Sequence, residues 1–430
     1  MSPGTRAASA PAVMLSRAPP RSRASPTGVQ GTAPCAPHSC GSIVRPAISI
    51  YTERSRRVKH RKLGRTGLEV SEIGLGTEFL NGQPRDTVVA VIAEALRAGV
   101  SYMDLLFCFQ DYLDNLGAAL QTAGGKPAIA GHLGCAETDG QYRKSRDPEE
   151  CDRNFNDMLA RVGIDHVDAL LIQNVDAEDD YQQIVGPGGL LEVARRQREA
   201  GRARFFGIST HKVPIAQAAL RSGLFDVLMF PVNPAFDAMP GDVSPWEASA
   251  AGAAAGSARR ELYRTCAGEG VGLVAMKPFA GGWFFRPDNP SGMTLTPVQG
   301  LSYALSQPGI STVVPGVKNT DELRAAMRFL EATPEEKDFS AAIAGSAGTA
   351  QGSCVYCNHC LPCPSLIDVG ETLRLLDIAE HHNTDNVRPA YAALSVKASA
   401  CVECGECVDR CPFGVDVIQR MRRAADVFGS

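Results

Sequence analysis

The end of this chain is organised by two cysteine runs, which read S-C-V-Y-C-N-H-C-L-P-C-P (353–364) and A-C-V-E-C-G-E-C-V-D-R-C-P (400–412). The second run has the spacing C-x2-C-x2-C-x3-C followed by proline, and the first is one residue shorter before its last cysteine. Three thiolates two residues apart can bind one face of a [4Fe-4S] cluster, and in two-cluster ferredoxins the fourth cysteine of each run binds the other cluster. The pattern predicts two [4Fe-4S] clusters, with one cluster as the alternative. The expected ligands are Cys354, Cys357, Cys360, Cys363, Cys401, Cys404, Cys407 and Cys411.

Zinc and disulfides are the alternatives for these cysteines. Zinc sites usually use two separated pairs of ligands rather than a run of four that ends in Cys-Pro. Disulfides need an oxidising compartment and do not readily join cysteines two residues apart. The spacing therefore favours iron–sulfur clusters, although the short first run leaves the role of Cys363 open.

Composition limits the class of protein. The chain has 430 residues, of which 44% are hydrophobic and 21% charged, and its formal net charge is −4. These values are ordinary for a soluble globular protein and give no reason to expect nucleic-acid binding. No apolar run reaches the roughly 18 residues that a membrane helix needs, so we expect no transmembrane segment. Free thiols and clusters predict a reducing, cytoplasmic location.

Residues 1–57 differ from the rest because they are rich in Ala, Pro, Ser and Arg, and Glu53 is their only acidic residue. This composition cannot bury a core, so we expect a disordered extension that lies upstream of the true start. The alternative is a targeting segment, in which case the location would be organellar. If residues 1–57 are instead a non-native extension, Cys35 and Cys40 have no function.

Short apolar strands alternate with amphipathic helices from Lys62 onward, after a hairpin signal around Gly67. This alternation predicts a (β/α)8 barrel at 58–338, a linker at 339–352 and a helical ferredoxin-like 4Fe-4S domain at 353–430. A doubly wound open sheet is the rival, but no G-x-G-x-x-G follows the first strand. The expected strands are 70–76, 102–106, 127–131, 168–173, 203–210, 226–232, 271–278 and 311–317.

Five further segments resemble the aldo/keto reductase family, in the branch that has a C-terminal ferredoxin-like module. They read K-L-G-R-T-G-L-E-V-S-E-I-G-L-G-T (62–77), G-V-S-Y-M-D (99–104), G-I-S-T-H (207–211), V-A-M-K-P-F-A-G-G (274–282) and V-V-P-G-V-K-N-T-D-E-L (313–323). Both cysteine runs match that branch too. The resemblance implies a barrel that binds NAD(P)H and transfers hydride to a carbonyl.

Family members use Asp, Tyr, Lys and His as a catalytic tetrad, in which the Tyr protonates the carbonyl oxygen. Here Asp104 matches the Asp, but Phe109, His132 and Gln173 stand at the other three positions. Phe has no proton to give, which argues against the family's ordinary mechanism. His132 could move a proton near neutral pH, or be hydrogen-bonded structure only.

Three other residues near strand ends are candidates because active sites of such barrels lie there. Lys277 would lie beside Asp104 or orient a substrate carboxylate. Cys108 and Tyr112 follow the second strand. Each has a purely structural role as its alternative.

The cofactor side keeps more of the family's pattern. Ser209 and Thr210 match the pair that binds the nicotinamide amide in the family. Met229 stands where the family usually has Gln, and Met276 stands where it often has an aromatic residue. A flavin is therefore an alternative cofactor. An anion site is expected where a helix begins after strand eight, and Lys318 there favours NADP over NAD. The residues concerned are Pro315, Gly316, Lys318 and Asn319.

The leading hypothesis is an iron–sulfur oxidoreductase that exchanges electrons between NAD(P)H, or a small-molecule substrate, and the clusters. An electron-transfer protein would be its partner. A non-catalytic scaffold or redox sensor is the second hypothesis, because the tetrad is altered. NADPH-dependent carbonyl reduction with His132 as the acid is the third.

Overall fold

The computed structural model describes residues 58–138, 140–238, 256–286, 292–344, 352, 354, 356, 358, 360–381, 384–411 and 414–429. The expected N-terminal extension and Cys357 therefore lie outside the described residues.

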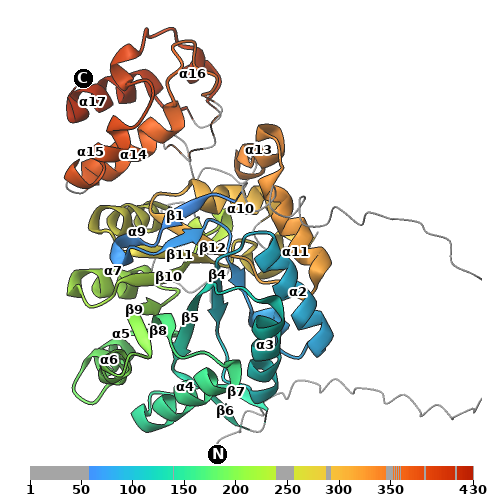
Figure 1. The fold of residues 1–430 in the computed structure, drawn as a ribbon. Coiled ribbons are helices and arrows are strands. Elements are labelled where there is room, and N and C mark those ends of the chain that lie inside the picture. The colour runs from blue at the N-terminus through green and yellow to red at the C-terminus, as the bar shows by residue number, and fades with distance from the viewer. Residues whose placement is uncertain are drawn as a thin grey trace, which may run out of the picture. The chain divides into compact units, whose positions relative to one another are not determined.

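A barrel of eight parallel strands forms the centre of the fold (Figure 1). The strands are β3 (Leu75–Gly76), β4 (Tyr102–Leu105), β5 (Ala128–Leu133), β8 (Val167–Ile172), β9 (Ala203–Ser209), β10 (Val227–Pro231), β11 (Gly272–Met276) and β12 (Ile310–Val314). They pair in the order β12-β11-β10-β9-β8-β5-β4-β3. Parallel bridges from Ile73 to Val313 and from Gly76 to Gly316 bring the two edges together. The (β/α)8 prediction is confirmed. Seven of the expected strands lie within a few residues of observed ones, and the first, 70–76, is divided between β2 (Glu69–Ser71) and β3.

Helices cover the outside of the strands because their apolar faces need a surface to bury against. The α-helices described over residues 58–338 are α2 (Arg85–Arg97), α3 (Gln110–Ala123), α4 (Pro148–Val162), α5 (Glu178–Val185), α6 (Leu190–Glu199), α7 (Val213–Ser222), α8 (Pro234–Asp237), α9 (Gly256–Glu269), α10 (Pro297–Ser306), α11 (Thr320–Met327) and α12 (Pro334–Lys337). Local signals define their ends. Thr296 and Gln299 form a capping box at the start of α10, and Asp147 accepts a hydrogen bond from the backbone N–H of Glu149 in α4.

Two antiparallel hairpins are added to the barrel. The first pairs β1 (His60–Lys62) with β2 (Glu69–Ser71), as the hairpin signal around Gly67 predicts. The second pairs β6 (Cys135–Thr138) with β7 (Gln141–Lys144) and lies between β5 and α4. We did not expect this hairpin, although the Asp139-Gly140 dipeptide between its strands is a common hairpin turn sequence.

The C-terminal part is helical, with α14 (Val369–His381), α15 (Arg388–Ala392), α16 (Glu406–Asp409) and α17 (Val417–Phe428). The segment 339–352, expected as a linker, contains helix α13 (Ser340–Ala344), in which Ile343 is buried. Arg264 of α9 forms an ion pair with Asp377 of α14 at 3.4 Å. No helix among the described segments is long and apolar enough to cross a membrane.

A close contact between α3 and α4 gives a stability prediction. A Cβ on Gly117 would overlap the backbone oxygen of Arg161, and a backbone atom cannot move aside as a flexible side chain can. We expect Gly117→Ala to destabilise the barrel by about 1–3 kcal/mol, which corresponds to a fall in the apparent Tm of about 3–8 °C. Thermal unfolding followed by far-UV circular dichroism measures this. Gln121→Ala, on the exposed face of the same helix, is the control and should change stability by less than about 0.5 kcal/mol. Equal Tm values for the two variants would contradict the close packing of these helices.

Candidate active site and cluster centre

A cavity of about 920 Å³ opens at the carboxyl ends of the barrel strands. Strand ends and the loops that follow them supply its walls, which is where this fold places active sites. Polar and ionisable side chains stand out among its mostly apolar lining. They are Glu78, Asp104, Tyr142, Gln173, Asn174, Ser209, His211, Lys277, Lys318 and Glu322.

Asp104 and His132 form a buried pair below this cavity. Asp104 is 6% exposed and His132 8%, and the Nε2 of His132 is 2.7 Å from the Oδ1 of Asp104. Asp104 lines the cavity, whereas His132 is not among the lining residues. The Nδ1 of His132 is buried and has no partner among the described residues. The geometry suits a histidine that holds Asp104 in place rather than one that contacts a substrate.

Phe109 and Gln173, at the other altered tetrad positions, have different surroundings. Phe109 precedes the first turn of α3 and packs against Phe107 with 5.2 Å between the ring centroids. Gln173 is fully buried against the cavity, and its Nε2 donates a hydrogen bond to the hydroxyl of Tyr142 at 3.0 Å.

Tyr142 is the cavity residue that sequence reasoning missed. It projects from β7 of the unexpected hairpin, is 37% exposed, and packs against Phe107 with 5.9 Å between the ring centroids. Its hydroxyl oxygen accepts hydrogen bonds from Gln173 and, at 2.9 Å, from the Nδ2 of Asn174. Because both neighbours donate, the phenolic proton is left for a third group. The Asp139-Gly140 dipeptide is the sequence signal that could have located its hairpin.

The pKa of Tyr142 is shifted by two opposing effects. Burial raises it, and the hydrogen bonds from Asn174 and Gln173 lower it, with a net upward shift. The phenol therefore keeps its proton at neutral and moderately alkaline pH.

His211, which is buried, and Asp176, which is half-buried, form a second pair at the cavity. The Nδ1 of His211 is 2.9 Å from the Oδ2 of Asp176, and the backbone N–H of His211 donates to Oδ1 at 2.7 Å. Burial by itself raises the pKa of Asp176, but the hydrogen bonds and charge of His211 outweigh it and lower the pKa to about 2. This carboxylate therefore stays ionised and fixes the imidazole ring at the cavity wall. The motif G-I-S-T-H at 207–211 contains His211 but does not by itself predict its pairing with Asp176.

Lys277 lies where β11 ends and lines the same cavity. Its backbone is left-handed, with φ of 55°, and its carbonyl accepts a hydrogen bond from Asn233 at 2.9 Å. Burial lowers the pKa of Lys277, and the charges of Glu78 and Asp176 partly oppose that effect. Lys277 is thus a cation of the cavity wall that interacts with the charges of Glu78 and Asp176, and such a cation suits an anionic substrate group or cofactor.

The expected cofactor residues divide into two groups. Ser209 lines the cavity, whereas Thr210 is fully buried and donates to Asp176 at 3.0 Å. Gly316 and Lys318 line the cavity on the opposite side, beside the ring of Phe79.

The start of α11, where an anion site was expected, is partly satisfied by its own side chains. Asn319 caps the helix by accepting from the backbone N–H of Glu322 at 2.9 Å. The carboxylate of Glu322 in turn accepts from the backbone N–H of Lys318 at 2.8 Å. A phosphate there would have to displace Glu322 or bind the remaining N–H groups together with the Lys318 ammonium.

Tyr112, the weaker candidate after strand two, does not line the cavity. It is 2% exposed, and its hydroxyl is hydrogen-bonded to Thr77 and to the backbone N–H of Leu106. Its environment is that of a structural tyrosine.

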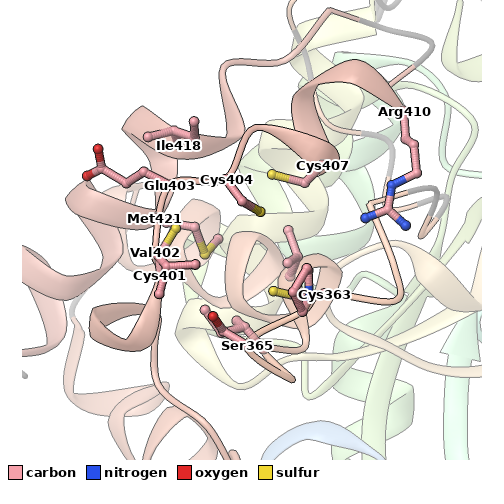
Figure 2. Close-up of a pocket in the computed structure, with 13 residues that line it drawn as sticks. Cys363, Ser365, Cys401, Val402, Glu403, Cys404, Cys407, Arg410, Ile418 and Met421 are labelled. Carbon is pink, nitrogen blue, oxygen red and sulfur yellow. The ribbon is translucent and has the colours of Figure 1, made fainter.

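The cysteine runs meet in the C-terminal domain. Cys363, the last cysteine of the first run, lines one pocket with Cys401, Cys404 and Cys407 of the second run (Figure 2). Apolar side chains such as Ile418 and Met421 complete this pocket. Four thiols around an apolar pocket are the donor set that a [4Fe-4S] cluster needs.

Cys411 is not in that group, and the chain around it turns toward the first run. The neighbouring Arg410 donates hydrogen bonds from Nη2 to the carbonyls of Cys360, at 3.4 Å, and Pro362, at 3.0 Å. These hydrogen bonds hold the end of the second run against the first run.

The fold and these sites agree with two family models. A model described as aldo/keto reductase family matches residues 72–299, and one described as a 4Fe-4S dicluster domain matches residues 353–416. The chain therefore belongs to the aldo/keto reductase family, a family of oxidoreductases, and carries a C-terminal 4Fe-4S domain. The resemblance inferred from the sequence is confirmed, and zinc is disfavoured.

Individual relatives are distant. The uncharacterized oxidoreductase YqkF of Bacillus subtilis (strain 168) is 23% identical over 177 residues, which are 40% of this chain and 56% of that protein. L-galactose dehydrogenase of Arabidopsis thaliana is 27% identical over 164 residues, 36% of this chain and 49% of that protein. This chain thus spans about half the length of these curated relatives.

Comparison with a solved structure supports the fold and no more than the fold. The aldo-keto reductase AKR11C1 from Bacillus halodurans, in its holo form, has a TM-score of 0.53 and 20% identity, and the match covers 68% of this chain and 97% of that chain.

Proposed function

We propose that this chain is an NAD(P)H-linked iron–sulfur oxidoreductase with two [4Fe-4S] clusters. The barrel cavity would take the nicotinamide and a small substrate. The observation that carries the proposal is the grouping of Cys363 with Cys401, Cys404 and Cys407, in a chain whose barrel cavity also lies at the usual active-site end. Clusters supply one-electron steps and nicotinamide supplies hydride, a two-electron carrier, so two clusters match one hydride.

The residues of this chain would bind and orient these groups. Ser209 would face the nicotinamide amide, and the Lys318 ammonium would contact a 2′-phosphate, which favours NADPH over NADH. Lys277 would hold an anionic part of the substrate. Electrons would leave the clusters to an electron-transfer protein.

An anaerobic titration of the cluster-loaded protein tests this proposal. We expect NADPH to bleach the visible cluster absorbance and to produce the EPR signal of reduced clusters. Lys318→Met should lower the ratio of NADPH to NADH affinity about tenfold, the effect of losing one contact of about 1.4 kcal/mol. Clusters that neither nucleotide reduces would overturn the coupling. If the protein also failed to bind either nucleotide, the scaffold or redox-sensing hypothesis would replace it.

Carbonyl reduction is a second candidate, and Tyr142 favours it. The Tyr142 hydroxyl lies beside Gln173, which stands at the family's His position. The amides of Gln173 and Asn174 donate to the hydroxyl oxygen, so the phenolic proton of Tyr142 is not used by either of them. We propose Tyr142, rather than His132, as the group that would protonate a carbonyl oxygen in the cavity. Asp104 and Lys277 would complete the polar wall around the substrate.

A further inference from the structure

Cys108 and Cys135 form a thiol pair outside the cluster-binding runs. Their Sγ atoms are 2.9 Å apart, and the backbone N–H of Cys108 donates to the Sγ of Cys135 at 3.3 Å. Sulfur atoms in a disulfide are about 2.05 Å apart, so this pair is about 0.9 Å from bonding distance. The two residues are brought together from separate strand ends, 27 positions apart in the sequence.

The environments of the two thiols differ in the way that a reactive and a resolving cysteine require. Cys108 is partly exposed, whereas Cys135 is only 3% exposed. The hydrogen bond from the Cys135 thiol lowers the pKa of Cys108 more than burial raises it. The same contact, together with burial, raises the pKa of Cys135. Cys108 is therefore the more readily ionised and the more accessible thiol of the pair, and so the better nucleophile.

The pair joins two segments of the cavity wall. Cys108 lies between β4 and α3, next to Phe107, which lines the cavity. Cys135 is the first residue of β6, in the hairpin that carries Tyr142. A covalent bond between the sulfur atoms would fix that hairpin to the loop that packs against it.

We propose that Cys108 and Cys135 are a redox-active pair, which a low-molecular-weight disulfide such as oxidised glutathione converts to an intramolecular disulfide. The Cys108 thiolate attacks one sulfur of the small disulfide, so that a mixed disulfide forms and one thiolate leaves. Cys135 then loses its proton and attacks the Cys108 sulfur, the mixed disulfide breaks, and the second thiolate leaves. The two leaving thiolates take up the two protons released by the cysteines. In sum, two cysteine thiols are oxidised and one small disulfide is reduced to two thiols.

Peptide mapping of the full-length, cluster-loaded protein tests the pair. The protein is incubated anaerobically with oxidised glutathione, its free thiols are alkylated, and it is digested by a protease that cleaves before aspartate. That cleavage places Cys108 in the peptide 104–110 and Cys135 in the peptide 114–138. We expect these two peptides to become linked, with a loss of two hydrogen atoms in mass and no retained glutathione.

Single variants separate the two steps. Cys135→Ser should keep a glutathione adduct on Cys108, because the resolving thiol is missing, and Cys108→Ser should leave Cys135 unmodified. Cys135→Ala replaces Cys135→Ser if the buried hydroxyl disturbs folding, as checked by far-UV circular dichroism. Cys151→Ser is the control, because Cys151 is a buried cysteine nearby whose thiol donates a hydrogen bond to the Ser145 carbonyl at 3.7 Å. This variant should still form the link between Cys108 and Cys135.

Hydrogen exchange gives a readout independent of activity. Oxidation should slow exchange in the hairpin 135–144 in the unsubstituted protein and leave it unchanged in Cys108→Ser, because the link restricts local opening of the hairpin. The proposal would be overturned by an unsubstituted protein in which Cys108 keeps glutathione without forming the link. It would also be overturned if both thiols stayed open to alkylation.

Discussion

Tyr142→Phe is expected to lower kcat/KM for NADPH-dependent aldehyde reduction by about 10²- to 10³-fold, measured with 4-nitrobenzaldehyde. A positioned general acid contributes this much to a rate, about 3–4 kcal/mol of transition-state stabilisation. The substitution removes the only proton that the Tyr142 side chain can donate, and it keeps the ring that packs against Phe107. The loss should therefore appear mainly in kcat, with the hairpin intact.

Tyr112→Phe is the matched control, because Tyr112 is also a tyrosine of the same cavity region but is buried against Thr77 and does not line the cavity. We expect Tyr112→Phe to change kcat/KM by less than about threefold, because the Tyr142 hydroxyl is still present to donate the proton. If Tyr112→Phe lost as much activity as Tyr142→Phe, the loss in Tyr142→Phe would come from disturbed structure and not from a missing proton donor. Full activity of Tyr142→Phe, with loss in His132→Ala, would return the acid role to His132.

The pH profile provides a further check on the same residue. Because the pKa of Tyr142 is raised above the ordinary value near 10, the protonated form that reduction needs persists through neutral and moderately alkaline pH. Reduction should lose rate only above about pH 10, and Tyr142→Phe should abolish that alkaline limb. An alkaline limb that survives in the variant would point to another acid.

Cys363→Ala is expected to lower the bound iron from about eight to about four atoms per chain, because it removes one of four ligands from one [4Fe-4S] cluster. Iron analysis and EPR of the anaerobically purified protein measure this loss. Alanine is used because serine can itself bind iron through its hydroxyl oxygen.

Two double variants show which cluster Cys363 binds. If Cys363 binds the same cluster as Cys404, the Cys363→Ala, Cys404→Ala protein should still hold about four iron atoms. The Cys363→Ala, Cys360→Ala protein should then hold about none, because both clusters lose a ligand. The opposite pattern would mean that each run binds its own cluster. Each double variant is thus the control for the other.

Much of the architecture could be predicted because its signals are local. Buried strands such as 168–173 and 203–210 read as short apolar runs, and their alternation with helices determines a parallel barrel. The cysteine spacing is equally local, since three ligands two residues apart already form one face of a cluster site. The hairpin 135–144 was missed because its strands are short and mostly polar.

The sequence by itself therefore determined the barrel, the iron–sulfur module and the family, and it predicts that three catalytic tetrad residues are replaced, at positions 109, 132 and 173. Only the tertiary structure decided what surrounds those positions. Gln173 meets Tyr142 across 31 residues of sequence, His211 meets Asp176 across 35, and Cys108 meets Cys135 across 27. Such contacts depend on the order in which strands pair around the barrel and on where an inserted hairpin folds back. No period or spacing within a single segment encodes them.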